Sequence, residues 1–267
     1  MQQFENQVVV ITGAGSGIGR ALALQLGREG ARLALSDIDL AAVQATAAAI
    51  GDAPRVRAYA LDVASREAVF AHAAQVQRDF GAVQVLVNNA GASIVGTIEH
   101  LSIEEIEWQL QVNLWSVIYG TKAFLPAMLQ QRQGLIVNIS SAFGFVALPT
   151  QGAYNIAKFG VRALNECLWR ELDGTGVRAV SVHPGGVRTQ IGKKARRAAR
   201  SGEAEDAVMA RTDQALVTPP EDMAAAIVKG LKRGDRRIVA GHMARLLFWL
   251  PRLLPNRYPD VLKRLGA

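Results

Sequence analysis

The chain has 267 residues, half of them hydrophobic, and a formal net charge of +7. This length suits one large α/β domain or two small ones. The single cysteine, Cys167, cannot form an internal disulfide, which excludes a cross-linked secreted scaffold. The N-terminus lacks the basic segment of a secretory signal, and no stretch reaches the roughly 18 uninterrupted apolar residues that a membrane-spanning helix needs. We therefore expect a cytoplasmic protein.

Short apolar runs rich in β-branched residues alternate with longer helical patterns along the chain. The predicted strands cover residues 8–12, 32–36, 56–60, 83–88, 135–140, 177–183 and 236–240. The predicted helices cover residues 17–29, 39–50, 65–80, 102–131, 152–174 and 220–233. This alternation predicts an α/β fold with a seven-stranded parallel sheet and helices on both faces. No linker rich in proline, glycine or serine divides the chain, so we expect a single domain over residues 1–267.

Glycines crowd the turn between the first strand and the first helix, in the segment TGAGSGIG at residues 12–19. Gly13, Gly17 and Gly19 allow the backbone to approach a phosphate, and the following helix offers unpaired N–H groups and a positive dipole end. Their spacing, Gly-x-x-x-Gly-x-Gly, matches neither the G-x-G-x-x-G dinucleotide fingerprint nor a nucleotide triphosphate loop. A tight strand-to-helix turn is therefore the alternative interpretation.

Two aspartates lie at the end of the second predicted strand. Asp37 stands 18 residues after Gly19, where a carboxylate can accept hydrogen bonds from an adenosine ribose and repel a 2′-phosphate. Asp39 suits the N-cap of the helix that begins there. We therefore assign Asp37 to the ribose and expect NAD to be preferred, with NADP as the second cofactor.

Tyr154 and Lys158 are four residues apart in a helical pattern, so both side chains project from one face of the helix. An ammonium near a phenol favours the phenolate, so we expect the pKa of Tyr154 to be lowered from about 10 towards neutrality. A phenol tuned in this way can exchange a proton with a substrate hydroxyl or carbonyl. Two ordinary helix residues are the alternative.

Two segments depart from the alternation of strands and helices. Residues 190–218 form a polar insertion, with basic side chains at Lys193, Lys194, Arg196, Arg197 and Arg200, where a short connection is usual; we expect a lid over the substrate. Residues 242–267 form an apolar and arginine-containing extension. We expect it to pack on the domain or on a neighbouring subunit, and rank a peripheral membrane contact below these.

Charge is concentrated in the same region. Residues 190–267 contain 16 Lys and Arg against 8 Asp and Glu, whereas residues 1–189 contain 14 against 15. No nucleic-acid recognition motif accompanies the basic charge, so we expect no nucleic-acid partner. A solvated surface, or attraction to an anionic substrate or lipid, is the better interpretation.

Seven motifs resemble the short-chain dehydrogenase/reductase family in order and spacing, over about residues 6–241. They are TGAGSGIG at 12–19, Asp62, NNAG at 88–91, Asn113, Ser141, YNIAK at 154–158 and PGGVRT at 184–189. The family carries the spacing Gly-x-x-x-Gly-x-Gly. The resemblance implies a single-domain, doubly wound Rossmann-type fold, a nicotinamide cofactor, and a homodimer or homotetramer.

The resemblance also implies catalytic roles. Tyr154 is the general acid/base, and Lys158 lowers its pKa and holds the nicotinamide ribose. Ser141 hydrogen-bonds the substrate oxygen; Ser140 competes for this role, and the family's 13-residue interval to the tyrosine favours Ser141. Asn113 helps to anchor a water that links Lys158 to solvent, with a satisfied polar residue at a helix kink as the alternative.

Cofactor contacts follow from the same motifs. Asp62 and Val63 contact the adenine edge, although an N-terminal helix cap is the rival role for Asp62. Residues 89–91 lie against the adenosine ribose and Asn88 is a structural brace. The implied cofactor-binding residues are Gly13, Ser16, Gly17, Ile18, Gly19, Asp37, Asp62, Val63, Asn89, Ala90, Gly91, Tyr154, Lys158, Pro184, Gly185, Val187 and Thr189. His183 is interpreted as structural, and no cluster of His, Cys and carboxylates indicates a metal.

The apolar segment at residues 142–153 predicts a hydrophobic secondary alcohol or ketone as substrate. Phe143, Phe145 and Leu148 line the substrate pocket, or else belong to the core or a subunit contact. The basic residues 193–200 raise a second hypothesis, reduction of a 3-oxoacyl thioester whose phosphates they would contact. A non-catalytic protein that senses the cofactor is the alternative from another class.

Overall fold

The computed structural model describes residues 3–51, 55–203, 205–208 and 216–265. Seven strands, all parallel, form one sheet in the order β3-β2-β1-β4-β6-β7-β9. Their bounds are β1 Val8–Thr12, β2 Arg32–Asp37, β3 Val56–Ala60, β4 Val85–Asn88, β6 Gly134–Ile139, β7 Val177–Gly185 and β9 Arg237–Gly241. The strand order reverses between β1 and β4, which confirms the predicted doubly wound fold.

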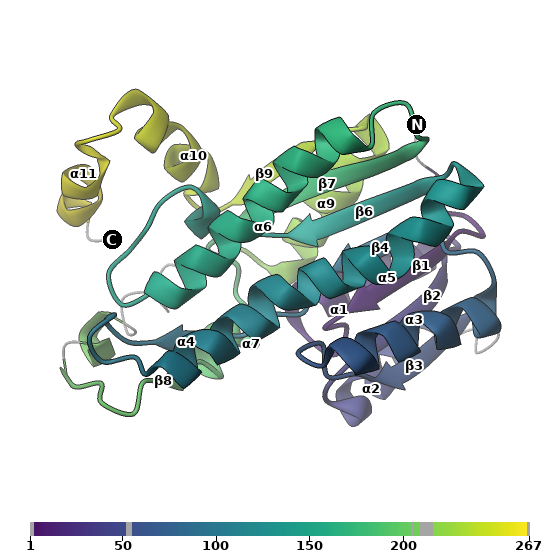
Figure 1. Cartoon of the computed structure of the whole chain (residues 1–267), viewed down its shortest axis with the longest axis horizontal. Coiled ribbons are helices and arrows are strands. Elements are labelled where there is room, and N and C mark those ends of the chain that lie inside the picture. The colour runs from purple at the N-terminus through teal and green to yellow at the C-terminus, as the bar shows by residue number, and fades with distance from the viewer. Residues whose placement is uncertain (1–2, 52–54, 204, 209–215, 266–267) are drawn as a thin grey trace.

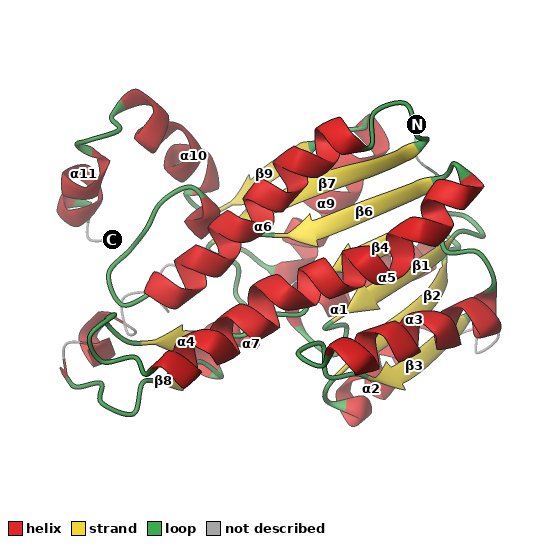
Figure 2. Ribbon diagram, viewed as in Figure 1, coloured by secondary structure: helices red, strands yellow, loops and turns green. Residues whose placement is uncertain are grey.

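Helices cover both faces of the sheet (Figures 1 and 2). One face carries α1 Gly17–Arg28, α2 Leu40–Ile50 and α9 Pro220–Arg233. The other face, which is in front in Figure 1, carries α3 Arg66–Phe80, α5 Ser116–Gln131 and α6 Gly152–Glu171. Val9 and Ile11 of β1 pack with the first set, and Val8 and Val10 with the second. Because successive strand side chains point to opposite faces, a strand covered on both sides is apolar throughout.

The predicted helix over residues 102–131 is interrupted. It consists of α4 Ile103–Leu110, a π-helical turn Gln111–Trp115, and α5. In that turn the N–H of Ser116 donates to the carbonyl of Gln111, five residues back, and the Ser116 hydroxyl donates to the carbonyl of Val112 over 2.6 Å. The side chain thus replaces the backbone bond that the wider turn removes. Such turns occur frequently at functional sites.

Strand β7 continues two residues beyond its predicted end and includes Pro184 and Gly185. Its neighbour β6 ends at Ile139, opposite Val182, so the last residues of β7 pair with β9 alone. A proline is tolerated there because only one side of the strand needs backbone hydrogen bonds.

Elements outside the sheet connect parts of the chain that are distant in sequence. β5 Ile94–Val95 pairs with β8 Arg196–Arg197 in a second, two-stranded parallel sheet, and α7 Gln190–Lys193 precedes β8. The extension contains α10 Ala244–Leu253 and α11 Tyr258–Arg264, which stand outside the helix layers (Figure 1). None of the described helices has the length and hydrophobicity needed to cross a bilayer.

Candidate active site

The glycine turn after β1 leads into the N-terminus of α1. Gly13 and Gly17 have φ values of +66° and +54°, which favour glycine. Ser16 precedes the helix and makes no side-chain hydrogen bond to its first turn, whereas the side chains of Asp39, Ser65 and Ser102 cap α2, α3 and α4. The N–H groups of the first turn of α1 are therefore left for a ligand. An uncapped helix end at the switch point of the sheet fits the pyrophosphate of a dinucleotide.

Thr12 connects this turn to the NNAG segment. Its hydroxyl accepts the N–H groups of Asn89 and Ala90, both over 3.1 Å. The Asn89 amide donates to the carbonyls of Thr12 and Gly13. The role of Thr12 was not predicted, although a polar residue that ends an apolar strand is a signal for it. Asn88 is a brace, as predicted, because its buried amide donates to Asn138 over 2.8 Å.

The three acidic candidates occupy distinct positions. One Asp37 oxygen accepts the N–H of Gly15 over 2.9 Å, and the other accepts that of Asp39, so the carboxylate lies directly beside the glycine turn. Asp39 caps α2 through the N–H of Ala42, which confirms its predicted cap role, whereas the assignment of Asp37 to the ribose stays a prediction. Asp62 is exposed and bonds the N–H of Ala64, while Ser65 caps α3. The capping alternative for Asp62 is therefore wrong.

Helix α6 places Tyr154 and Lys158 one turn apart. The Lys158 ammonium lies 5.6 Å from the centre of the Tyr154 ring and donates to the carbonyl of Ile139 over 3.0 Å. Burial lowers the pKa of Lys158 to about 8. Burial also raises the pKa of Tyr154 to about 12, and a hydrogen bond with the Ser141 hydroxyl counteracts this only in part. The predicted lowering of the tyrosine pKa is therefore wrong for the protein alone, because desolvation raises the pKa more than the Ser141 hydroxyl lowers it.

The two candidate serines point in different directions. The buried Ser140 hydroxyl donates to the backbone carbonyl of Lys158 over 2.8 Å. The Ser141 hydroxyl lies near enough to Tyr154 to lower its pKa, and it accepts the N–H of Phe143 over 3.1 Å. Ser141 is thus the serine that shares a site with the tyrosine.

Asn113 lies in the π-helical turn and is fully buried. Its amide donates to the carbonyl of Ala92 over 2.7 Å and its oxygen accepts the N–H of Ala92. A Cβ on Gly91 would lie 2.7 Å from that oxygen and 3.8 Å from the Lys158 nitrogen. The structure therefore brings together Asn113, the NNAG segment and Lys158, as their assigned roles require. The hydrogen bonds of the side chain also suit the alternative of a satisfied residue at a kink.

The PGGVRT segment lies across from the glycine turn. A Cβ on Gly17 would lie 3.0 Å from the methyl carbon of Thr189, whose hydroxyl accepts the N–H of Ile191. Thr218 bonds the backbone of Gly186 and Arg188 in a parallel bridge, so the N–H and carbonyl of Val187 point away from that bridge. No described residue forms a hydrogen bond with these backbone groups, so they can face a cofactor.

His183 is structural, as predicted. Its ring is buried, stacks on Phe145 at 4.1 Å, and makes hydrogen bonds with the Ser181 hydroxyl and the Ser141 carbonyl. Burial lowers its pKa to about 3.

The lowered pKa of His183 predicts that the folded protein loses stability at acid pH. Because the folded-state pKa lies below the unfolded value of about 6.5, the contribution of His183 is complete above pH 6.5 and is lost as the pH falls towards 3. The free energy of unfolding should fall by about 1.4 kcal/mol per pH unit from this group. Urea unfolding between pH 7 and 4.5 should show a shallower slope for His183→Gln. The exposed His242→Gln variant serves as control, and equal slopes in all three proteins would contradict the assignment.

The segment after Ser141 is held by Asn155, which was not predicted. The Asn155 amide donates to the carbonyls of Phe143 and Val146, and its oxygen accepts the N–H of Leu148. Phe143 meets the Tyr154 ring edge-on at 6.3 Å. Phe145 instead enters a buried cluster with Leu247 and Leu250 of α10. Of the predicted pocket residues, Phe143 therefore lies beside the reacting groups and Phe145 belongs to the core.

The described part of the basic insertion, which leaves out residues 204 and 209–215, contacts α4 and β5. The Arg196 guanidinium lies 3.8 Å from the centre of the Trp108 ring, Arg197 pairs with Asp206, and Arg200 donates to the carbonyl of Glu99. Buried Glu205 binds His100 at 2.5 Å. Three of the five basic residues therefore already have partners in the protein.

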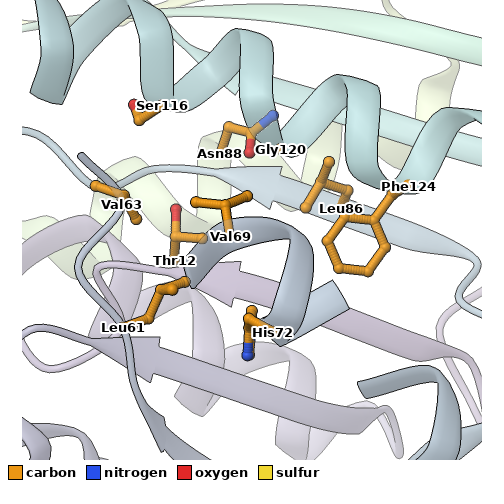
Figure 3. Close-up of a pocket in the computed structure, with 10 residues that line it drawn as sticks. All are labelled: Thr12, Leu61, Val63, Val69, His72, Leu86, Asn88, Ser116, Gly120 and Phe124. Carbon is orange, nitrogen blue, oxygen red and sulfur yellow. The ribbon is translucent and has the colours of Figure 1, made fainter. Parts of the chain in front are cut away.

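A small pocket between α3 and α5 lies behind the cofactor turn and does not include the reacting groups (Figure 3). Its lining is half apolar and includes Thr12 and Val63, of which Val63 is an implied adenine contact. Tyr154, Lys158 and Ser141 do not line it. We interpret it as a packing gap behind the braces of the cofactor turn.

The fold and the site define an oxidoreductase of the nicotinamide-dinucleotide type. The chain matches the short chain dehydrogenase family over residues 7–200. It is 44% identical to SadH of Mycobacterium tuberculosis, described as an oxidoreductase, over 97% of this chain and 94% of that protein. This protein belongs to the short-chain dehydrogenase/reductase family.

Solved structures similar to this chain belong to the same family. A short-chain dehydrogenase/reductase from Burkholderia phymatum in complex with NAD superposes with a TM-score of 0.87 at 29% identity, covering 99% of this chain and 97% of that one. A metagenomic short-chain oxidoreductase in complex with NADP gives 0.73 at 29% identity, covering 90% and 99%. A nicotinamide cofactor is thus supported, with both forms represented among similar structures.

Proposed function

We propose that this enzyme transfers a hydride between NAD and a hydrophobic secondary alcohol or ketone. The observation that carries the proposal is the grouping of Tyr154, Ser141 and Lys158 at the carboxyl edge of the sheet, with Phe143 against the tyrosine ring. The uncapped N-terminus of α1 and the carboxylate of Asp37 border the same edge. A nicotinamide, when bound, supplies or accepts the hydride.

The protein groups handle the proton. In reduction, the Tyr154 hydroxyl donates its proton to the carbonyl oxygen while Ser141 donates a hydrogen bond to the same oxygen. A pKa of about 12 keeps the phenol protonated at neutral pH, which suits this direction. In oxidation the phenolate takes the hydroxyl proton, and a charged Lys158 favours the phenolate. The Ile139 carbonyl accepts a hydrogen bond from the Lys158 ammonium and holds it in place, and Gly91 leaves space beside the ammonium.

The surroundings of Tyr154 favour an apolar substrate. Phe143 and Leu148 follow Ser141, and Met243 and Phe248 of the extension join them in one hydrophobic cluster. The thioester hypothesis needs free basic groups on the insertion, whereas Arg196, Arg197 and Arg200 have protein partners. A panel of medium-chain and cyclic secondary alcohols, their ketones and 3-oxoacyl thioesters tests this. Turnover of thioesters alone would reject the proposed substrate class.

Replacing Asp37 should change the cofactor preference. Asp37→Asn retains an oxygen that accepts the N–H of Gly15 but removes the charge that repels a 2′-phosphate. We expect the ratio of kcat/KM for NADP to that for NAD to rise by about tenfold or more, because opposing like charges costs several kcal/mol. Steady-state kinetics with both cofactors measures this ratio.

Asp39→Asn is the matched control. It makes the same change two residues away, and asparagine caps a helix as well as aspartate does. Its cofactor ratio should equal that of the wild type. A wild-type preference for NADP, or an unchanged ratio in Asp37→Asn, would show that Asp37 does not select the cofactor.

A further inference from the structure

The extension after β9 has an inward face that belongs to the core. Ala244, Leu247 and Leu250 of α10 and Leu262 of α11 are buried in one cluster with Phe145. This confirms the expectation that the extension packs on the protein. Phe248, Tyr258 and Val261 pack against the same cluster, which leaves Leu246, Trp249 and Leu253 of these helices outside it.

The outward side of α10 carries a second apolar stripe. Leu246, Trp249 and Leu253 are 43%, 55% and 72% exposed. Their spacing of three and four residues aligns them along one face, roughly opposite to Ala244 and Leu247. Leu254 and Leu265 are also exposed, at 39% and 56%. An isolated exposed leucine is ordinary, but an aligned apolar stripe on a projecting helix indicates an interaction surface.

Basic residues flank this stripe. Residues 242–267 contain five Lys and Arg and one acidic residue, Asp260. Arg245 is exposed beside the stripe on α10, whereas the Arg252 guanidinium turns back over the rings of Phe145 and Phe248. Arg257, Lys263 and Arg264 are exposed around α11. We define the tail face as Leu246, Trp249, Leu253, Leu254 and Leu265 with the basic side chains of Arg245, Arg257, Lys263 and Arg264.

We propose that the tail face binds the surface of an anionic membrane. A helix that combines exposed leucine and tryptophan with arginine and lysine binds at such a surface through apolar burial and charge attraction together. A second copy of the chain is a poor occupant, because a two-fold contact would oppose this basic set with itself. Figure 1 shows α10 and α11 projecting from the layered body, which leaves the face accessible to a flat surface.

The position of the tail face gives the proposal a functional consequence. Met243 and Phe248 belong to the cluster that contains Phe143 and Leu148, near Tyr154. A membrane bound to the outer side of α10 therefore lies one helix away from the apolar surroundings of the reacting groups. Membrane binding itself does not depend on the proposed substrate and is measured without turnover.

Vesicle sedimentation with the full chain tests the proposal. We expect binding to vesicles of phosphatidylcholine with about 30% phosphatidylglycerol to exceed binding to phosphatidylcholine alone, and to weaken as salt is raised. Arg245→Gln and Lys263→Gln should each weaken binding by about fivefold. Leu253→Gln should weaken it further. Ile103→Gln, a similarly exposed aliphatic residue on α4, should not.

Tryptophan fluorescence shows which part of the protein touches the membrane, and it needs only conservative Trp→Phe changes. Brominated lipids in the anionic vesicles should quench the wild type, and this quenching should be lost in Trp249→Phe but retained in Trp115→Phe, a tryptophan of similar exposure on another surface. Absence of binding to the anionic vesicles, or quenching that survives Trp249→Phe, would overturn the proposal. So would a smaller oligomer for Leu253→Gln in gel filtration, because the face would then be a subunit contact.

Discussion

Tyr154→Phe should lower kcat by about 10²- to 10⁴-fold, the usual contribution of a positioned general acid/base. The variant removes one oxygen and keeps the ring that meets Phe143 edge-on at 6.3 Å. Cofactor binding and thermal stability should therefore remain close to those of the wild type. Steady-state rates with the best substrate of the panel, together with the Kd for NAD from fluorescence titration, separate the chemical step from binding.

Tyr59→Phe is the matched control for this loss. Tyr59 lies on β3, the edge strand of the sheet, and its hydroxyl donates a hydrogen bond to Asp79 over 2.7 Å. Its removal should cost about 1 kcal/mol of stability and leave kcat unchanged. If Tyr154→Phe retained more than about a tenth of the wild-type kcat, the assignment of Tyr154 as general acid/base would fail.

Gly19→Ala should disrupt the cofactor turn. A Cβ at this position would lie 2.2 Å from the carbonyl oxygen of Gly13 and 2.5 Å from the Asn89 amide. The backbone of the turn must move to accommodate it. Overpacking of this kind costs about 1–3 kcal/mol, and a displacement of about 1 Å at the site can lower kcat/KM about 100-fold. Kinetics with NAD and thermal unfolding measure the two effects.

Gly27→Ala tests whether this effect comes from the turn. Both glycines lie in α1, and in both cases alanine raises helix propensity by about 1 kcal/mol. At Gly27 the nearest atom to the added Cβ is a methyl group of Ile50 at 2.7 Å, which belongs to a side chain. This variant should retain wild-type kcat/KM. Equal losses in both variants would attribute the effect to the helix and not to the cofactor turn.

Local sequence patterns predicted the parts of this protein that depend on near neighbours. The seven strands are apolar runs because both faces of the sheet are covered, and periodicity alone reveals such runs. Asp39 as a helix cap, and the shared face of Tyr154 and Lys158, follow from spacings of three or four residues. Five of the seven motifs lie at the ends of strands, and parallel strands end at one edge of the sheet, so the sequence predicts that these motifs meet. Asn113 and the YNIAK segment instead lie on helices.

Features that depend on contacts between distant residues required the tertiary structure. Sequence periodicity did not predict that Arg196 pairs with Ile94 in a second sheet, or that Glu205 binds His100. The π-helical turn at Asn113 arises where the Ser116 hydroxyl replaces a backbone bond. The pKa of Tyr154 is raised because the folded chain buries its hydroxyl, and burial is not visible in the spacing of Tyr154 and Lys158. Short periods along the chain are enough to predict which residues form the sheet and which strand-end motifs meet at its edge. The packing of the extension, and of the described part of the insertion, appears only in the folded protein. The same holds for the burial of each polar group, because burial is the sum of contributions from the whole chain.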